Sequence, residues 1–271
     1  MAIPAPAADR TAVVTGASSG IGREIARGLA GRGHGLTLVA RREERLRELA
    51  RELTDAHGVR VEVVPADLAD AAARTGVVEA VRAAGLVPHV LVNAAGVSTV
   101  GPVHASDPDA EVAMLRTDVE AVAHLCSLVL PGMVERRAGA VLNVASTAAF
   151  QPLPGQAGYA AAKAFVLSYS QALRGELRGT GVTVTALCPG PVRTEFAERA
   201  GFDPAEAEAA LPWPLWVPVE RVAEAGIEAL EQGRATVVPG VANRLVAVGG
   251  RLAPRSLLVP AVARRHPGLR R

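Results

Sequence analysis

The chain has 271 residues, 49% of them hydrophobic and 3% aromatic, and it carries a formal net charge of +2 at pH 7. This length is enough to bury a full core, and the small net charge, without a clustered basic and aromatic surface, argues against a nucleic-acid partner. The profile is typical of a soluble α/β protein rich in Ala, Val and Leu.

The two cysteines, Cys126 and Cys188, form neither a disulfide framework nor a metal-ligand spacing. We expect them to be small core residues in a reducing compartment, which makes the cytoplasm the expected location and leaves no expected metal site. Residues 1–10 contain two prolines and no apolar segment, so no signal peptide is expected. No apolar run approaches the roughly 18 to 20 residues that a membrane span needs.

A glycine turn follows the first predicted strand. Residues 11–15 predict this strand and residues 23–32 a helix, with Gly16-Ala-Ser-Ser-Gly-Ile-Gly22 between them. Glycines let the backbone approach a pyrophosphate closely, and a helix N-terminus offers unpaired N–H groups. The Gly-Lys-Ser/Thr ending of a nucleotide-triphosphate loop is missing. We predict dinucleotide binding here; the alternative is a tight strand-to-helix connection without a ligand.

Two arginines follow the second predicted strand, residues 36–40. Arg41 and Arg42 stand where an NAD enzyme would place an acidic residue for the ribose 2′-hydroxyl. Two cations suit a 2′-phosphate, and charge at the following helix N-terminus should otherwise be acidic. The sequence therefore favours NADP(H) over NAD(H). The alternative is that the arginines begin a solvated, charged helix face.

The next two strand ends carry polar or small residues. The predicted strand 60–65 is followed by Asp67 and Leu68, and the carboxylate is suited either to an adenine amino group or to capping a helix. The predicted strand 90–92 ends in Asn93-Ala94-Ala95-Gly96, where a flat cofactor would find room and Asn93 would tie the turn. A plain Asn/Gly turn is the alternative for this motif.

Strands near residues 11, 36, 60 and 90, each followed by a helical segment, predict right-handed βαβ units. Such units form a parallel, doubly wound sheet with helices on both faces. A helix at 219–232 and a strand at 235–238 would complete seven strands. We expect one α/β domain over residues 1–240, followed by a helical tail over residues 241–271.

In the second half of the chain, a serine hydroxyl, a tyrosine phenol and a lysine ammonium follow one another at a strand end and a helix start. A long helix is predicted at 109–137, the strand 140–145 ends at Ser146, and Tyr159 opens a helix that runs to residue 178. Lys163, the only lysine of the chain, follows Tyr159 by four residues and so shares its helical face. A nearby ammonium lowers the pKa of a phenol from about 10, as proton transfer requires. The alternative is a surface lysine after a half-buried core tyrosine.

A sixth strand at 182–187 leads into a turn from Cys188 to Thr194 that would carry the chain over the ligand edge. In order, the motifs resemble those of the short-chain dehydrogenase/reductase family over roughly residues 11–194. They are Thr15-Gly16-x-x-x-Gly20-x-Gly22, Asp67, Asn93-Ala-Ala-Gly96, Ser146, Tyr159-x-x-x-Lys163 and Pro189-Gly190-x-Val192-x-Thr194.

The resemblance implies a Rossmann fold and hydride transfer with NAD(P)H, with Tyr159 as general acid/base, Lys163 on the nicotinamide ribose and Ser146 on the substrate carbonyl. It also implies a homodimer or homotetramer, paired through the helices 109–137 and 158–178. The expected cofactor-binding residues are Gly16, Ser18, Ser19, Gly20, Ile21, Gly22, Arg41, Arg42, Asp67, Leu68, Asn93, Ala94, Gly96, Tyr159, Lys163, Pro189, Gly190, Val192 and Thr194.

One position departs from the family. Asp118 lies in the segment where the family usually has an Asn that supports a water chain to the lysine. If the backbone carbonyl holds that water, the relay survives the change. If the side chain matters, a carboxylate there would stabilise the charge of Lys163 and indirectly raise the pKa of the phenol. The alternative is that Asp118 is a polar helix residue away from the site, and we assign it no catalytic role.

Residues 190–217 resemble the substrate lid of the family. We predict an apolar pocket closed by Phe196, Phe202, Leu211, Trp213, Leu215 and Trp216, with Val97 and Phe150 as further walls. The alternative is that these side chains pack the segment onto its own domain or onto a second subunit.

The tail 241–271 contains seven arginines and no acidic residue: Arg244, Arg251, Arg255, Arg264, Arg265, Arg270 and Arg271. A basic amphipathic helix can lie on a membrane or dock on a partner. The sequence favours a helix packed beside the fold with a solvated arginine face.

The expected function is that of a carbonyl reductase: NADPH-dependent reduction of an apolar or aromatic ketone or aldehyde, or the reverse alcohol oxidation. A non-catalytic dinucleotide sensor would use the same fold but has little reason to keep Ser146, Tyr159 and Lys163 together. An epimerase or dehydratase would use the same triad, yet such relatives usually need a larger substrate domain than the residues after Thr194 provide.

Overall fold

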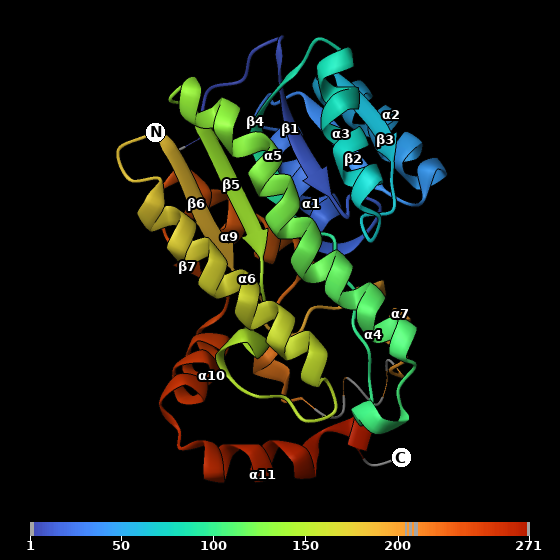
Figure 1. Ribbon diagram of the computed structural model, residues 1–271, viewed down its shortest axis with the longest axis vertical. Helices are drawn as coiled ribbons and strands as arrows, with labels where there is room; N and C mark the ends of the chain where they lie inside the picture. The colour runs from blue at the N-terminus through green and yellow to red at the C-terminus, as the bar shows by residue number, and fades with distance from the viewer. Residues whose placement is uncertain (1–2, 204, 206–207, 209–210, 270–271) are drawn as a thin grey trace.

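A parallel sheet is the centre of the computed structural model, which describes every residue except 1–2, 204, 206–207, 209–210 and 270–271. Within that part of the chain, seven strands form one sheet in the order β3-β2-β1-β4-β5-β6-β7 (Figure 1), and the doubly wound sheet predicted from sequence is confirmed. The strands are β1 Arg10–Thr15, β2 Leu36–Ala40, β3 Val61–Pro65, β4 Val87–Asn93, β5 Gly139–Val144, β6 Val182–Leu187 and β7 Thr236–Val237.

The strand order reverses at β1, which pairs in parallel with β2 on one side and β4 on the other. At such a switch point the connecting helices leave toward opposite faces, and a crevice opens beyond the carboxyl ends of the strands. Five consecutive residues of β1, Thr11 to Thr15, are buried, as expected for a central strand covered on both sides. The crevice therefore lies just beyond Thr15 and the carboxyl end of β4.

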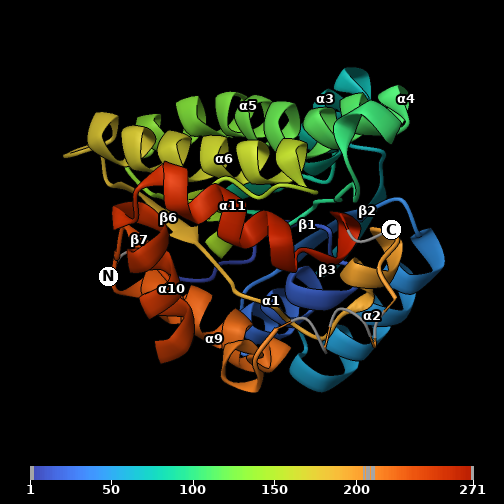
Figure 2. The same ribbon diagram turned by 90° about the horizontal axis from the view of Figure 1, so that it is seen from below.

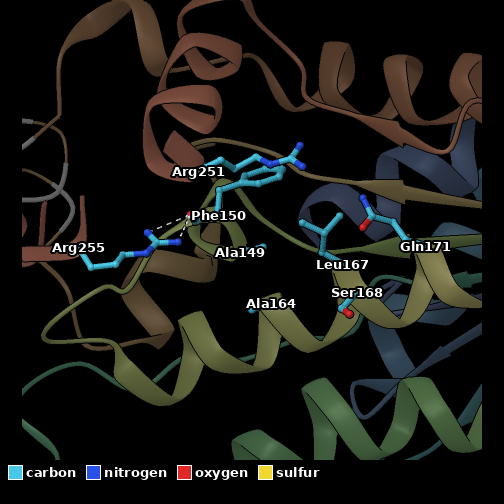
Figure 3. Close-up of a pocket in the computed structure, with 8 residues that line it drawn as sticks. All are labelled: Ala149, Phe150, Ala164, Leu167, Ser168, Gln171, Arg251 and Arg255. Carbon is cyan, nitrogen blue, oxygen red and sulfur yellow. Dashed lines mark hydrogen bonds between the residues drawn. The ribbon is translucent and has the colours of Figure 1, made fainter. Parts of the chain in front are cut away.

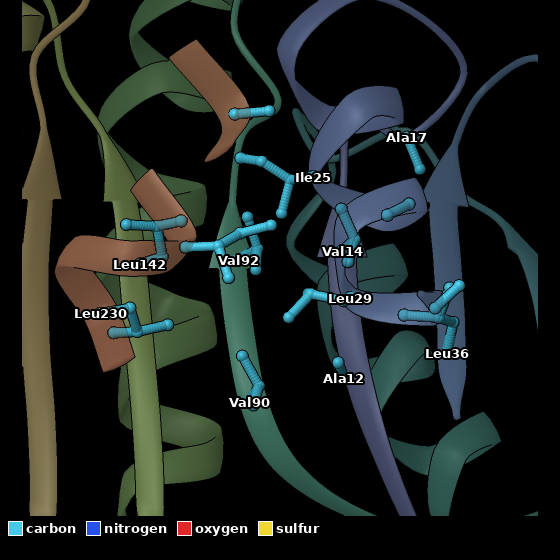
Figure 4. Packing of buried hydrophobic residues seen from close by; sticks show 14 of the residues in the cluster. Ala12, Val14, Ala17, Ile25, Leu29, Leu36, Val90, Val92, Leu142 and Leu230 are labelled. Carbon is cyan, nitrogen blue, oxygen red and sulfur yellow. The ribbon is translucent and has the colours of Figure 1, made fainter. Parts of the chain in front are cut away.

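Helices cover both faces of the sheet (Figure 2). The helices α1 Gly20–Ala30, α2 Glu43–His57 and α9 Val219–Glu231 lie on one face, and α3 Ala71–Ala83, α5 Ala121–Glu135 and α6 Ala157–Glu176 on the other. The apolar residues of α1 recur at helical spacing, and its Ile25 and Leu29 pack fully buried against β1, β4 and α9 (Figure 4). This packing fixes the helix that follows the glycine turn.

The long helix predicted at 109–137 is interrupted. The structure divides it into α4 Pro108–Leu115, a π-helical turn η2 Arg116–Glu120 and α5, and α5 ends at Glu135. By length and composition alone the run Pro108–Glu135 is apolar enough to cross a membrane, so the expectation that no such run exists is wrong by that criterion. The run packs on α3, α6 and the sheet, as a layer helix does. The π-turn matters for the site because it carries Asp118.

The tail forms two helices, α10 Val241–Leu252 and α11 Arg255–Arg265, and a short turn η5 Pro267–Leu269. In Figure 1 they lie below the carboxyl ends of the strands, and Figure 2 shows α11 crossing that edge of the sheet. Arg270, Arg271 and the side chain of Arg265 lie outside what the structure describes. The remaining short elements are η1 Val103–Ala105, η3 Thr147–Phe150, α7 Glu195–Arg199 and η4 Trp213–Leu215.

Candidate active site

The glycine turn is packed too tightly for any side chain at two of its positions. A Cβ on Gly16, which has φ +67°, would lie 2.8 Å from the backbone of Ala94, and a Cβ on Gly22 would lie 2.6 Å from the carbonyl oxygen of Gly16. Gly20 also has a positive φ, of +57°. The turn thus presses against the end of β4 and leaves its backbone facing the crevice.

Thr15 joins the end of β1 to the end of β4. The sequence motif includes this residue, but no role was predicted for it. Its Oγ1 donates to the carbonyl oxygen of Val92 at 3.2 Å and accepts from the N–H groups of Ala94 and Ala95 at 3.0 and 3.1 Å. A buried hydroxyl at the end of a β-branched strand, next to a glycine turn, is the sequence signal for such a tie.

The two arginines after β2 differ in their surroundings. Arg42 donates to the Ser18 side chain at 2.9 Å and pairs with Glu195 of α7 at 2.8 Å. Arg41 is exposed, and its Nη1 lies 4.0 Å from Oδ2 of Asp67. Both side chains line the crevice, which leaves positive charge beside the glycine turn.

Asp67, Leu68, Ala94 and Gly96 line the same crevice, but the Asn93 side chain does not. Asn93 is buried and its Nδ2 donates to Oδ1 of Asn143 at 2.8 Å, while Asn143 donates to Ser170. The amide group of Asn93 therefore faces away from the crevice, and the assignment of Asn93 as a cofactor-binding residue stays a prediction. Asn93 instead ties β4 to β5, because a polar side chain under a sheet must find a buried partner.

Ser146 follows β5, and Tyr159 lies in the first turn of α6. Ser146 accepts a hydrogen bond from the N–H of Ala148 at 3.1 Å, which holds its hydroxyl at the start of η3. Burial raises the pKa of Tyr159 above its ordinary value, while the Lys163 charge and the Ser146 hydroxyl lower it and the Asp118 charge raises it. The three predicted catalytic side chains are thus brought together at the edge of the sheet.

Lys163 is held from two sides. Its Nζ donates to the carbonyl oxygen of Val144 at 3.2 Å and lies 2.9 Å from Oδ2 of Asp118. The ammonium is also 5.6 Å from the centre of the Tyr159 ring. Burial opposes the charge of Lys163, but Asp118 and Tyr159 raise its pKa above the ordinary value, so the side chain is an ammonium at neutral pH.

Asp118 therefore belongs to the site. Its side chain is 0% exposed, and its Oδ1 accepts from the N–H of Val97 at 2.8 Å. Burial raises the pKa of this carboxyl group, and the charge of Lys163 opposes that rise. Gly96 makes room for the pair, because a Cβ there would lie 3.1 Å from Asp118 Oδ2 and 3.2 Å from Lys163 Nζ.

A cavity of about 1070 Å³ joins the glycine turn to these side chains. The predicted lid residues Phe196, Phe202, Leu211, Leu215 and Trp216 line it, as do Val97 and the motif residues Pro189, Gly190, Val192 and Thr194. The Phe196 ring lies 5.6 Å from the Tyr159 ring. The cavity thus runs from a glycine-lined end to an apolar end.

Two predicted walls are wrong. Trp213 is 80% exposed and does not line the cavity. Phe150 is buried against Val166 and Leu167 and faces a separate hollow of about 330 Å³ (Figure 3), where Arg251 lies over its ring and Arg255 donates to its carbonyl oxygen. Composition alone could not distinguish an aromatic residue that faces the ligand from one that packs behind it.

The tail supplies cavity residues that the sequence did not indicate. Leu258 and Val262 of α11 line the cavity, and so does His266. The His266 ring is buried, its Nε2 lies 3.1 Å from Oε1 of Gln156, and its Nδ1 accepts from the N–H of Gly268 at 3.2 Å. Since Nδ1 accepts, Nε2 carries the proton and donates to Gln156. The tail therefore closes one side of the cavity.

The two thiols are core residues that do not line the cavity. Cys126 and Cys188 are free and buried, and burial raises the pKa of each to about 12. A thiol protonated at all physiological pH values is a poor nucleophile. Among the described residues, no group of three or more His, Cys, Asp or Glu side chains is placed to hold a metal ion.

Comparison with known proteins identifies the class. The short chain dehydrogenase family model matches residues 10–204. The chain is 40% identical to sulfoacetaldehyde reductase 2 of Chromohalobacter salexigens over 201 residues, covering 73% of this chain and 79% of that protein. It is 37% identical to a very-long-chain 3-oxoacyl-CoA reductase of Anas platyrhynchos over 200 residues, covering 71% and 63%. The chain spans less than two thirds of the length of two of the first curated relatives it matches.

A solved structure agrees. The fold matches a short-chain dehydrogenase from Sphingobium yanoikuyae in complex with NADPH, with a TM-score of 0.79, 34% identity, and coverage of 93% of this chain and 95% of that one. The chain belongs to the short-chain dehydrogenase/reductase family and is an oxidoreductase with a Rossmann-type fold.

Proposed function

We propose that the protein is an NADPH-dependent reductase of an apolar ketone or aldehyde, or catalyses the reverse alcohol oxidation. The observation that carries the proposal is the meeting of Ser146, Tyr159 and Lys163 in one cavity with the glycine turn. A phenol flanked by an ammonium and a hydroxyl is suited to exchanging a proton with a substrate oxygen.

The cofactor proposal rests on how well the crevice fits a phosphorylated dinucleotide. Gly16 and Gly22 leave no room for side chains beside the N-terminus of α1, where free N–H groups attract a pyrophosphate. Arg41 and Arg42 place two guanidinium groups next to it, which suits a ribose 2′-phosphate and favours NADP(H) over NAD(H). The neighbour from Sphingobium yanoikuyae was solved with NADPH, which supports this choice.

The bound nicotinamide would supply or accept the hydride, and the chain's own residues would manage the proton. Ser146 would donate a hydrogen bond to the carbonyl oxygen, and Tyr159 would give that oxygen its phenolic proton. Lys163 would stabilise the phenolate that remains, because its ammonium lies 5.6 Å from the ring centre. In the direction of oxidation, the same phenolate would take the proton of the alcohol.

The cavity favours an apolar substrate over a small charged acid. Its wall includes Phe196, whose ring contacts that of Tyr159, with Phe202 and Trp216 from the lid and Leu258 and Val262 from the tail. Apolar walls with a few directed polar groups are typical of sites for apolar small molecules. The similarity to a very-long-chain 3-oxoacyl-CoA reductase agrees with this, whereas the similarity to a sulfoacetaldehyde reductase favours a small anionic aldehyde.

The assay is NADPH consumption with a panel of carbonyl compounds, comparing the wild type with Tyr159→Phe. We expect the variant to lose most turnover while it still binds NADPH in a fluorescence titration, because the phenol contributes a proton and not the main cofactor contacts. Tyr169→Phe is the matched control, since Tyr169 is the other tyrosine of α6 and stacks on Phe165. Full activity in Tyr159→Phe refutes the mechanism, and NADPH binding without turnover of any carbonyl by the wild type favours a sensor.

We further propose a homodimer or homotetramer in the cytoplasm. Leu115 on α4 and Phe165 on α6 are exposed apolar side chains on helices that contact each other, which supports pairing through this layer. The two buried free thiols support a reducing compartment. Light scattering in solution tests the assembly.

A further inference from the structure

The outer face of α10 is an apolar stripe without a partner among the described residues. Its side chains recur every three or four positions, so they share one helix face, and they are 71%, 70%, 53% and 79% exposed. They are Val241, Leu245, Val248 and Leu252. The opposite face packs on the domain with Asn243, Ala247 and Gly250 buried. The helix packs beside the fold and its Arg244 and Arg251 are exposed, as the sequence favoured, but its outermost stripe is apolar.

Unpaired positive charge flanks this stripe. Several arginines elsewhere in the chain pair with carboxylates, among them Arg27 with Glu52, Arg32 with Glu224 and Arg42 with Glu195. In the tail, Arg244, Arg251 and Arg255 pair with no carboxylate among the described residues, and residues 232–271 contain no acidic residue at all. The charge on this face is thus left for an external anion.

Arg251 is the arginine best placed to meet such an anion. It lies over the Phe150 ring in the hollow beside α10, 5.9 Å from the ring centre, whereas Arg255 donates to the carbonyl oxygens of Phe150 and Gly250 (Figure 3). The ring contact leaves the N–H groups of Arg251 free of any hydrogen bond to the described residues. One helix therefore presents an apolar stripe and, next to it, guanidinium groups that can bind phosphate oxygens.

We propose that α10 docks the protein on an anionic lipid surface. The stripe Val241, Leu245, Val248 and Leu252 enters the interface between headgroups and acyl chains, and the guanidinium groups of Arg244 and Arg251 bind lipid phosphates. A second copy of this chain is the poorer occupant, because a two-fold contact through α10 would set this positive charge against its own image without any acidic residue of the tail to neutralise it. The next helix, α11, lines the cavity, so the docking surface and one wall of the active site belong to the same segment.

The experiment is flotation of the full chain with vesicles of phosphatidylcholine alone and of phosphatidylcholine with phosphatidylserine. We expect recovery with the anionic vesicles and little with neutral ones, and a loss of binding at high salt. Arg251→Gln should weaken binding about fivefold, the effect of one basic residue near such a surface. Leu245→Ser should weaken it by a similar or larger factor because it removes buried apolar area.

Matched controls are Arg47→Gln on α2 and Val112→Ser on α4, which remove an exposed arginine and an exposed apolar side chain away from α10. Both should float like the wild type. The proposal is overturned if the wild type stays unbound on anionic vesicles, or if the α10 and control variants bind equally. It is also overturned if light scattering shows that Leu245→Ser dissociates an oligomer while vesicle recovery is unchanged, since α10 is then a protein interface.

Discussion

Asp118 and Lys163 form a buried ion pair, with Oδ2 and Nζ 2.9 Å apart. Both charges act on the pKa of the neighbouring Tyr159 phenol. The carboxylate has two opposite effects on catalysis. It stabilises the ammonium, which helps a phenolate form, and its own negative charge raises the pKa of Tyr159. An asparagine would keep the hydrogen bond from Val97 and remove only the charge.

We therefore predict that Asp118→Asn retains at least wild-type turnover and shifts the pH profile of alcohol oxidation to lower pH. The direction follows because removal of the negative charge lowers the pKa of Tyr159, so the phenolate is present at lower pH. The measurement is kcat/KM against pH, with Asp109→Asn, an exposed carboxylate on α4, as the control. A folded Asp118→Asn enzyme without turnover would sink the idea and make the carboxylate itself essential.

The second prediction concerns the choice of cofactor. Replacing Arg41 and Arg42 together by Gln should raise the KM for NADPH by about 10- to 100-fold, the worth of hydrogen bonds to a charged group, and leave the KM for NADH nearly unchanged. Arg42 also holds Glu195 of the lid, so its loss alone is ambiguous.

Arg45→Gln resolves that ambiguity. Arg45 pairs with the same Glu195 at 2.5 Å but does not line the cavity. It should leave the NADPH-to-NADH ratio unchanged if the two crevice arginines recognise the 2′-phosphate. Equal weakening of both cofactors in the double variant would instead show that the arginines only hold the lid and the glycine turn together.

The third prediction uses two stacked histidines far from the site. His34 precedes β2 and His89 lies on β4; both are buried, with Nδ1 of His34 and Nε2 of His89 2.9 Å apart and ring centres 5.0 Å apart. Burial lowers the pKa of His34, and burial together with the neighbouring ring lowers that of His89 from 6.5 to about 4. The folded state therefore holds both rings neutral at pH values where the unfolded chain binds protons.

The stability from this pair is present above pH 6.5 and is lost as the pH falls toward 4. The free energy of unfolding should drop by up to about 3 kcal/mol across that window because of His89. His89→Gln should flatten the pH dependence measured by urea unfolding, whereas His57→Gln, at the exposed end of α2, should not. The same slope in both variants would show that other groups cause it.

The fold was predictable because its signals are periodic and local. The strands 36–40 and 182–187 have the predicted bounds, since short apolar runs between glycine turns and helices leave one reading. The glycine turn and the Ser146, Tyr159 and Lys163 cluster were predictable because each motif lies at a strand end or a helix start. The interruption of the long helix was not predictable. The π-turn at 116–120 adds one residue to a helical turn, but the amino-acid composition of the segment still looks helical.

What failed was the direction of individual side chains. Asn93, Phe150 and Trp213 all belong to segments that line the cavity, but their side chains point elsewhere. Asn93 faces the buried Asn143, Phe150 faces a hollow behind the site, and Trp213 faces solvent. The role of the tail was equally hidden, because His266 reaches Gln156 across 110 positions of sequence. Contacts of that range depend on the packing of whole helices and leave no local periodicity.

The burial of Lys163 gives the protein an unusual chemical signature. Lys163 is the chain's only lysine, and its side chain is 6% exposed and paired with Asp118. Amine-directed reagents therefore have only two targets, the α-amino group and this buried ammonium. Any acylation beyond the terminus therefore reports that the active site has opened. A bound cofactor should protect Lys163 from acylation. The mass increment of one acyl group on Lys163 would therefore measure, in the wild-type protein, how much of the site is unoccupied.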